Sequence, residues 1–102
     1  MQEYHQGDLV RIGRFTQNFV IVSNNSFIRA TGMFHVCPFL QGVSDGPLHI
    51  SAQASSGTAG TAILEQIKLI DPEARPVRKT DHLFYRDIME LSDALQGMFD
   101  DD

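Results

Sequence analysis

Side chains able to perform acid–base or phosphate chemistry recur at the ends of the apolar segments of this sequence. They fall into three groups along the chain: Arg11, Arg14 and Thr16; Asn24, Arg29 and Thr31; and Glu65, Gln66 and Lys68. Metal-independent cleavage of a phosphodiester beside a 2′-hydroxyl needs a base for that hydroxyl, a cation for the charge on phosphorus and an acid for the leaving oxygen. Arg, Glu, His and Thr side chains can fill these roles. On strands the same residues are more often solvated or paired on the surface, so alone they define no reaction.

Motifs of other site classes are absent from the sequence. Residues 57–60 contain two glycines but lack the lysine that follows the last glycine of a phosphate-binding loop. No Gly-x-Ser-x-Gly nucleophile motif occurs. The histidines and the single cysteine are too scattered for the ligand spacing of a zinc site or for an internal disulfide: His5, His35, His49, His82 and Cys37. We therefore expect neither a metal nor a cofactor.

Length and composition predict one folded domain spanning residues 1–102. The chain is 42% hydrophobic and 21% charged, as is usual for a globular protein of this size. Its longest apolar runs, such as residues 19–22, are far shorter than the roughly 20 residues of a membrane span. The first five residues lack the basic and apolar regions of a signal peptide. The sequence therefore predicts a cytoplasmic protein with no membrane partner.

Short apolar stretches separated by turn residues predict a mainly β (α+β) fold. The predicted strands are 8–12, 19–23, 33–37 ended by Pro38, 48–52 and a long last strand over 61–70. A helical turn over 27–31 should close at Gly32. The small residues of 54–60 favour a mobile loop, and residues 71–74 favour a turn. This spacing is typical of a small antiparallel barrel or sandwich.

The end of the chain predicts an amphipathic helix with Asp81 as its N-cap. Apolar residues follow at spacings of four, three, four and three: Phe84, Ile88, Leu91, Leu95 and Met98. This stripe should lie across an open side of the sheet, and the acidic residues should face solvent. Residues 81–102 carry a net charge of −6, whereas the first 80 residues carry +1. The overall charge of −5 disfavours non-specific binding to nucleic acid.

Four segments in order resemble the MazF/PemK family of toxins. They are Gly7-Asp8-Leu9-Val10; Val20-Ile21-Val22-Ser23-Asn24-Asn25-Ser26-Phe27-Ile28-Arg29; Phe34-His35-Val36-Cys37-Pro38; and residues 60–71 with Arg75. The resemblance covers nearly the full chain. It implies a small SH3-like/CcdB-like antiparallel barrel with a C-terminal helix, and a homodimer. It also implies cleavage of single-stranded RNA and inhibition by a cognate antitoxin.

The sequence departs from this family at two catalytic positions. Gln17 aligns with the family's catalytic Arg, Asn18 with the following Pro, and Leu40 with the catalytic Thr. Gln17 and Leu40 offer neither a charge nor a hydroxyl. We therefore predict that Arg14 and Thr16, displaced by a shorter loop, are catalytic together with Glu65, which matches a family acidic residue. The predicted substrate-binding residues are Arg11, Gln17, Asn24, Arg29, Gln66 and Lys68.

Three functions follow from these observations. The first is the toxin of a type II toxin–antitoxin system, a sequence-selective endoribonuclease. The second is a catalytically degenerate homodimer of the same fold that binds an antitoxin and regulates its operon. The third, a CcdB-like poison of another protein, is disfavoured because three Asp follow Met98-Phe99 where that family ends in Trp-Gly-Ile. An acidic antitoxin segment would need a basic groove, predicted from Arg11, Arg14, Arg29, Lys68, Arg75, Arg78 and Lys79.

Overall fold

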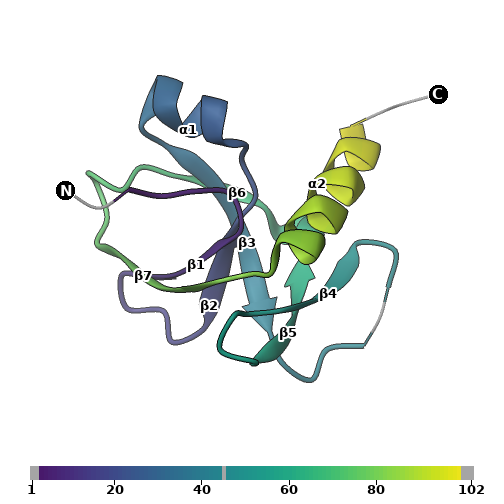
Figure 1. The fold of residues 1–102 in the computed structure, drawn as a ribbon. Helices are drawn as coiled ribbons and strands as arrows, with labels where there is room; N and C mark the ends of the chain where they lie inside the picture. The colour runs from purple at the N-terminus through teal and green to yellow at the C-terminus, as the bar shows by residue number, and fades with distance from the viewer. Residues whose placement is uncertain (1–2, 45, 100–102) are drawn as a thin grey trace.

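A computed structural model of the protein describes residues 3–44 and 46–99. These residues form one antiparallel sheet with two α-helices and a short 3-10 helix (Figure 1). In chain order the elements are β1 (Asp8–Ile12), β2 (Asn18–Ile21), α1 (Asn25–Thr31), β3 (Phe34–Leu40), β4 (His49–Gln53), β5 (Ala59–Ile63), η1 (Leu64–Gln66), β6 (Lys68–Ile70), β7 (Val77–His82) and α2 (Tyr85–Phe99). Within this part of the chain no helix is long and apolar enough to span a membrane.

The sheet has the strand order β4-β5-β3-β2-β1-β7, and β6 pairs separately with β3. One edge of β3 pairs with β2, and the other pairs first with β6 and then with β5. The two ends of the sheet meet at a single bridge between Ala54 and Leu83. The predicted antiparallel sheet with a C-terminal helix is therefore confirmed, but the strands do not close into a barrel.

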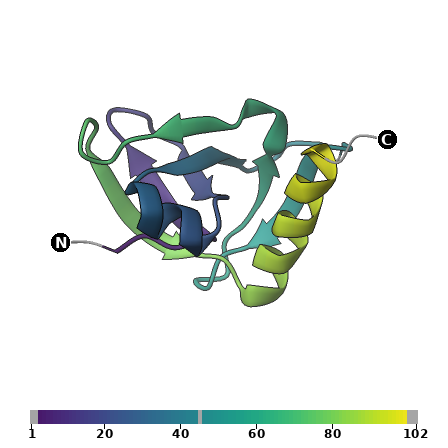
Figure 2. The same cartoon turned by 90° about the horizontal axis from the view of Figure 1, so that it is seen from above.

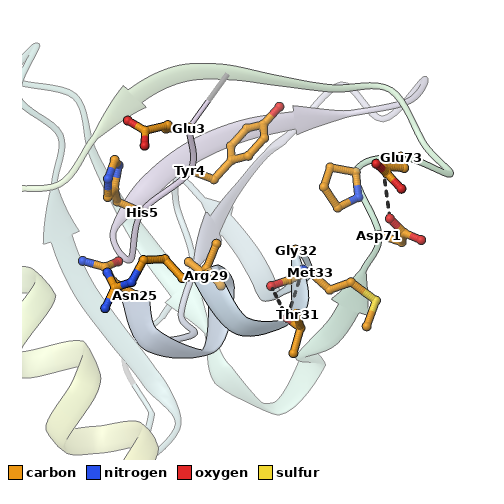
Figure 3. A pocket seen from close by; sticks show the side chains of 12 residues that line it. Glu3, Tyr4, His5, Asn25, Arg29, Thr31, Gly32, Met33, Asp71 and Glu73 are labelled. Carbon is orange, nitrogen blue, oxygen red and sulfur yellow. Dashed lines mark hydrogen bonds between the residues drawn. The ribbon is translucent and has the colours of Figure 1, made fainter. Parts of the chain in front are cut away.

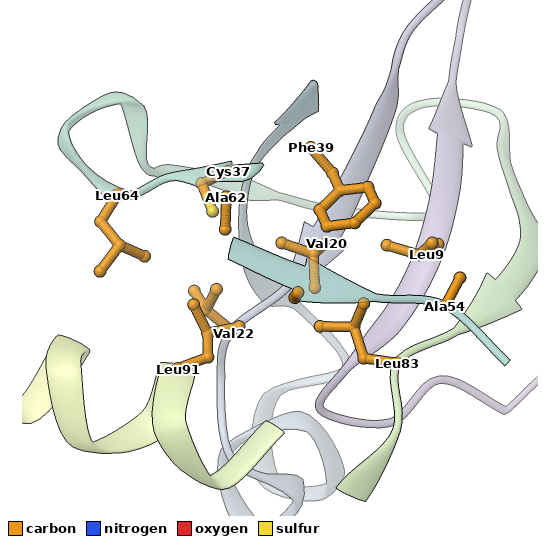
Figure 4. Packing of buried hydrophobic residues seen from close by; sticks show 11 residues of the cluster. Leu9, Val20, Val22, Cys37, Phe39, Ala54, Ala62, Leu64, Leu83 and Leu91 are labelled. Atoms are coloured by element: carbon orange, nitrogen blue, oxygen red, sulfur yellow. The ribbon is translucent and has the colours of Figure 1, made fainter. Parts of the chain in front are cut away.

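The central strands are buried on both faces because they separate two hydrophobic clusters. Val20 and Cys37 face the larger cluster, which β4, β5 and α2 cover (Figure 4). Phe19, Ile21 and Val36 face the smaller cluster on the opposite side of β2 and β3. Strands of this kind lose the alternation of apolar and polar residues that marks a half-exposed sheet. Seen from above, α1 and α2 stand apart on the molecule (Figure 2).

Helix α1 confirms the predicted helical turn, although it begins two residues earlier. The Asn24 side chain accepts a hydrogen bond from the Phe27 N–H, as an N-cap does. Gly32 ends the helix in the left-handed conformation, with φ of 71°, and its N–H bonds back to the Ile28 carbonyl. The helix is held locally by these caps.

Three predicted boundaries were wrong. The strand expected to end at Pro38 continues to Leu40, because Pro38 lies between the stretch that pairs with β6 and the stretch that pairs with β5. The long strand over 61–70 is broken into β5, η1 and β6, because Leu64 turns into the core and its N–H bonds to the Leu48 carbonyl. The loop expected over 54–60 gives way to β5 at Ala59, which pairs with Gln53.

The N-cap prediction for α2 was also wrong. Asp81 lies within β7, where it pairs with Leu9, and the helix starts only at Tyr85. The first helical N–H groups bond to the Phe84 carbonyl, and the Phe84 side chain is 46% exposed instead of lying on the apolar stripe. The rest of the stripe packs on the larger cluster as expected: Ile88, Leu91, Leu95 and Met98.

Candidate functional site

The β1–β2 hairpin and the start of β6 meet around two aromatic rings. Phe15 at the hairpin tip packs edge-on against Phe19 of β2, with ring centroids 5.6 Å apart. The Lys68 ammonium lies over both rings, 4.6 Å from the Phe15 centroid and 4.7 Å from the Phe19 centroid. Because Arg14 and Thr16 flank Phe15 and are exposed, the structure brings Lys68 to the hairpin that carries them.

Neighbouring elements bring more basic residues to the same hairpin. The Gly13 N–H bonds to the Pro76 carbonyl, which places the β6–β7 turn containing Arg75 beside it. Arg11 pairs in register with Arg78 of β7. We call Arg11, Arg14, Lys68, Arg75 and Arg78 the hairpin basic cluster. Its members lie on two faces of the sheet: Arg11 and Arg78 project away from the smaller cluster that contains Val10 and Ile12, whereas Lys68 lies over Phe19 of that cluster.

Two residues of the predicted groove lie elsewhere. The Lys79 ammonium is 3.3 Å from the buried Asp8 carboxylate. Arg29 lies on α1, where its guanidinium contacts Ser26 Oγ at 3.4 Å. The seven basic residues therefore do not form one groove, and five of them gather near the hairpin.

A network of polar side chains fixes part of this cluster on the outer surface of β2, β1 and β7. The Arg11 Nε donates to Asn18 Oδ1 at 3.1 Å, and the Thr80 hydroxyl lies 3.2 Å from the same oxygen. Asn18, which the resemblance aligns with the family's Pro, is thus the acceptor that orients Arg11. Without this hydrogen bond to the amide oxygen of Asn18, the long side chain of Arg11 would be free to move.

Glu65 lies in η1 and contacts a residue that the sequence analysis did not select. Its Oε1 is 2.6 Å from Nε2 of His49 at the start of β4. The other ring nitrogen of His49 is 2.9 Å from the Ser44 carbonyl oxygen. His49 pairs with Ile63 across β4 and β5, so the turn at η1 brings Glu65 back over it. This contact could be predicted only from the pairing of β4 with β5. Residues 48–52 have the weakest strand pattern of the predicted strands, so that pairing could not be assigned from the sequence.

The remaining predicted binding residues do not share one surface. Asn24 is used as the cap of α1, and Arg29 lines a separate cavity of about 680 Å³ between α1, the N-terminal segment and residues 71–73 (Figure 3). Gln66 is exposed beside Glu65, and Gln17 is half-buried at the base of the hairpin. The structure therefore joins Lys68 to the hairpin and Glu65 to His49, and separates Asn24 and Arg29 from both.

The single cysteine is not a nucleophile in this fold. Burial raises the pKa of the Cys37 thiol to about 12, so it stays protonated near neutral pH. Among the residues that the structure describes, no three His, Cys, Asp or Glu side chains lie close enough together to hold a metal ion.

Comparisons with known proteins give a clear result only at the level of structure. No protein-family model and no curated protein matches the sequence. A MazE–MazF crystal structure (Form II) from Deinococcus radiodurans superposes with a TM-score of 0.80 at 15% identity, and covers 100% of both chains. MazF alone (Form I) from the same organism gives a TM-score of 0.76 at 15% identity, covering 96% of this chain and 97% of that one. This chain has a MazF-like fold.

Within this MazF-like fold, the two diverged family positions lie together. Asn18 pairs with Phe39, so Gln17 and Leu40 occupy the same end of β2 and β3, at the base of the hairpin. Leu40 pairs on its other side with Thr61, which is 6% exposed. The cationic groups nearest in sequence to this point are Arg11 and Arg14.

Proposed function

We propose that this chain is the toxin of a type II toxin–antitoxin pair and cleaves single-stranded RNA without a metal, as a cytoplasmic homodimer. The observation that carries the proposal is the MazF-like fold, which covers the whole chain. The hairpin basic cluster supports it, because an acidic protein needs a local concentration of cations to bind a phosphate backbone.

The described side chains offer each role that the cleavage requires. Arg14 and Lys68 supply positive charge for the oxygens on phosphorus, and Thr16 supplies a hydroxyl that can donate to one of them. Glu65 supplies a carboxylate for proton transfer from the 2′-hydroxyl. Arg11 and Gln66 bind flanking phosphate or base groups. Asn24 and Arg29, which lie away from this surface, are not part of the proposed site.

The proposed protein partner is an antitoxin with an acidic, extended segment. The structures that this chain resembles include MazE–MazF complexes, which motivates the choice of partner class. Arg14 and Lys68 of the hairpin basic cluster are the cations that best complement such a segment. Bound there, the antitoxin would cover Arg14 and Lys68 and exclude RNA by occupying the same cations.

Incubation of the pure, EDTA-treated protein with a long single-stranded RNA tests the proposal. We expect discrete cuts, mapped by their new 5′ ends, that disappear in an Arg14→Ala, Glu65→Ala double variant. Arg86→Ala is the matched control, because Arg86 is an exposed arginine on α2, away from the hairpin. Intact RNA after prolonged incubation with the wild type would contradict the nuclease assignment.

A specific observation favours a second candidate, an antitoxin-binding homodimer without nuclease activity. Gln17 and Leu40 stand side by side where the family has a charge and a hydroxyl, and Leu40 is fixed in β3 by pairing with Thr61. Protection of the hairpin basic cluster from trypsin by an acidic antitoxin, together with intact RNA, would select this function.

A further inference from the structure

The contacts of His49 determine where its protons lie. The Ser44 carbonyl oxygen can only accept a hydrogen bond, so Nδ1 of His49, 2.9 Å away, must carry a proton. In a neutral imidazole the other nitrogen, Nε2, then has a lone pair and no proton. Nε2 lies 2.6 Å from Glu65 Oε1. A lone pair facing a carboxylate at this distance would be repulsive, so the two groups must share a further proton.

We infer that His49 is a positioning residue that holds Glu65 as the general base of RNA cleavage; this inference rests on the proposed function. His49 and Glu65 form an imidazolium–carboxylate couple, in which one carboxylate oxygen bonds to Nε2 and the other remains for substrate. The side chain of Glu65 is 47% exposed and that of His49 is 24% exposed, so Glu65 is the member that RNA can reach.

The fold fixes this couple from both sides. His49 belongs to β4 and pairs with Ile63, and the Leu64 N–H bonds to the Leu48 carbonyl, so η1 is tied to the strand that carries His49. Two residues after η1, Lys68 is held over the rings of Phe15 and Phe19. One short segment therefore links the base to the hairpin basic cluster. A pair placed by backbone contacts loses little conformational entropy when it forms.

The proposed step transfers one proton to the couple and later returns it. The 2′-oxygen forms a bond to phosphorus as its proton passes to the outward oxygen of Glu65, and the bond between phosphorus and the 5′-oxygen breaks. The 5′-oxygen takes a proton from water, and the couple gives its proton to the hydroxide so formed. The products are a 2′,3′-cyclic phosphate and a 5′-hydroxyl, and the couple returns to its starting state.

Replacing His49 with Gln and with Ala separates this role from a structural one. A Gln amide can donate a hydrogen bond to Glu65, but it has no positive charge. We expect His49→Ala to lower kcat by about 100-fold, because a displaced Glu65 carboxylate loses the alignment that proton transfer needs, with KM changed less than twofold. His49→Gln should recover part of this loss. Exogenous imidazole should restore part of the activity of His49→Ala. The matched control is His82→Gln, because His82 is exposed on β7.

Each outcome decides the inference. A double variant, His49→Gln with Glu65→Gln, should be no slower than Glu65→Gln alone, because His49 acts through Glu65. Wild-type activity in His49→Ala would overturn the role of His49 and leave the nuclease function standing. If the folded wild type makes no cuts, both the nuclease function and the role of His49 are overturned. Thermal midpoints of the variants identify any loss of folding.

Discussion

At the scale of single residues, Asp81 shows how a carboxylate joins two distant parts of the chain. Its Oδ1 accepts hydrogen bonds from the Ser55 hydroxyl at 2.6 Å and from the His82 N–H at 2.8 Å. The Ser55 N–H bonds in turn to the His82 carbonyl, beside the bridge between Ala54 and Leu83. These bonds connect the β4–β5 turn with the end of β7, where the sheet comes nearest to closing.

Replacing Asp81 with Ala should destabilise the protein in a pH-dependent way. Hydrogen bonds from Ser55 and Ser56 lower the pKa of Asp81 from 3.8 to about 2. A lowered carboxyl pKa contributes stability that is present above pH 3.8 and is lost as the pH falls through about 2. At pH 7 we expect Asp81→Ala to lower the free energy of unfolding by about 0.5–1 kcal/mol, since Asp81 is only partly buried.

Thermal unfolding from pH 7 down to pH 2 measures this effect. The midpoint of the Asp81→Ala variant should lie below that of the wild type at pH 7 and should converge on it between pH 4 and pH 2. Asp93→Ala, at an exposed position on α2, serves as the control. A constant difference across this range would mean that the bonds to Asp81 do not depend on its ionised form.

At the scale of secondary-structure elements, β3 and β5 approach closely because Gly60 has no side chain. A Cβ on Gly60 would lie 2.5 Å from the nearest ring atom of Phe39, which is itself 5% exposed. Gly97 is the opposite case, since nothing lies within 4 Å of a Cβ placed there in α2. The structure therefore has room for a side chain at Gly97 but not at Gly60.

Substituting each glycine with Ala should change stability in opposite directions. Gly60→Ala should lower the free energy of unfolding by about 1–3 kcal/mol, because the Phe39 ring must move in a packed core. Gly97→Ala should raise it by up to about 1 kcal/mol, because Ala is the better helix former. Urea denaturation measures both values. Equal stability of Gly60→Ala and wild type would show that Phe39 adjusts without cost.

Local sequence patterns predicted the elements well where the contacts are local. The glycine at Gly32 and the apolar stripe of α2 each act within one or two turns of helix, whereas Asn24, predicted to bind substrate, is the N-cap of α1. The break at Leu64 could not be predicted this way. It depends on the point along β3 at which the pairing strand changes from β6 to β5. The contact between His49 and Glu65 was missed for the same reason: it requires the register of β4 against β5.

At the scale of the whole molecule, charge is segregated. The chain carries a net charge of −5, yet the hairpin basic cluster gathers five cations at one hairpin, while Asp87, Glu90 and Asp93 lie on α2. Asp87 also contributes to packing, since its carboxylate accepts a bond from the Gln53 N–H of β4. The rest of the surface should therefore repel RNA, and binding should depend on few contacts.

This segregation predicts a shallow salt dependence for RNA binding. Each phosphate contact to a single strand contributes a slope of about −0.7 to the logarithm of the binding constant against the logarithm of salt concentration. Five cations therefore give a slope no steeper than about −3.5. Removing Arg14 and Lys68 together should make it shallower by about 1.4.

Fluorescence anisotropy with an uncleavable 2′-deoxy analogue measures the slope without interference from cutting. Arg29→Ala should leave it unchanged, because Arg29 lines the cavity beside α1 and not the hairpin. A slope much steeper than −3.5 would mean that cations outside the hairpin basic cluster also bind phosphate, such as those of a second copy of the chain. An unchanged slope in the Arg14, Lys68 double variant would place the RNA on another surface altogether.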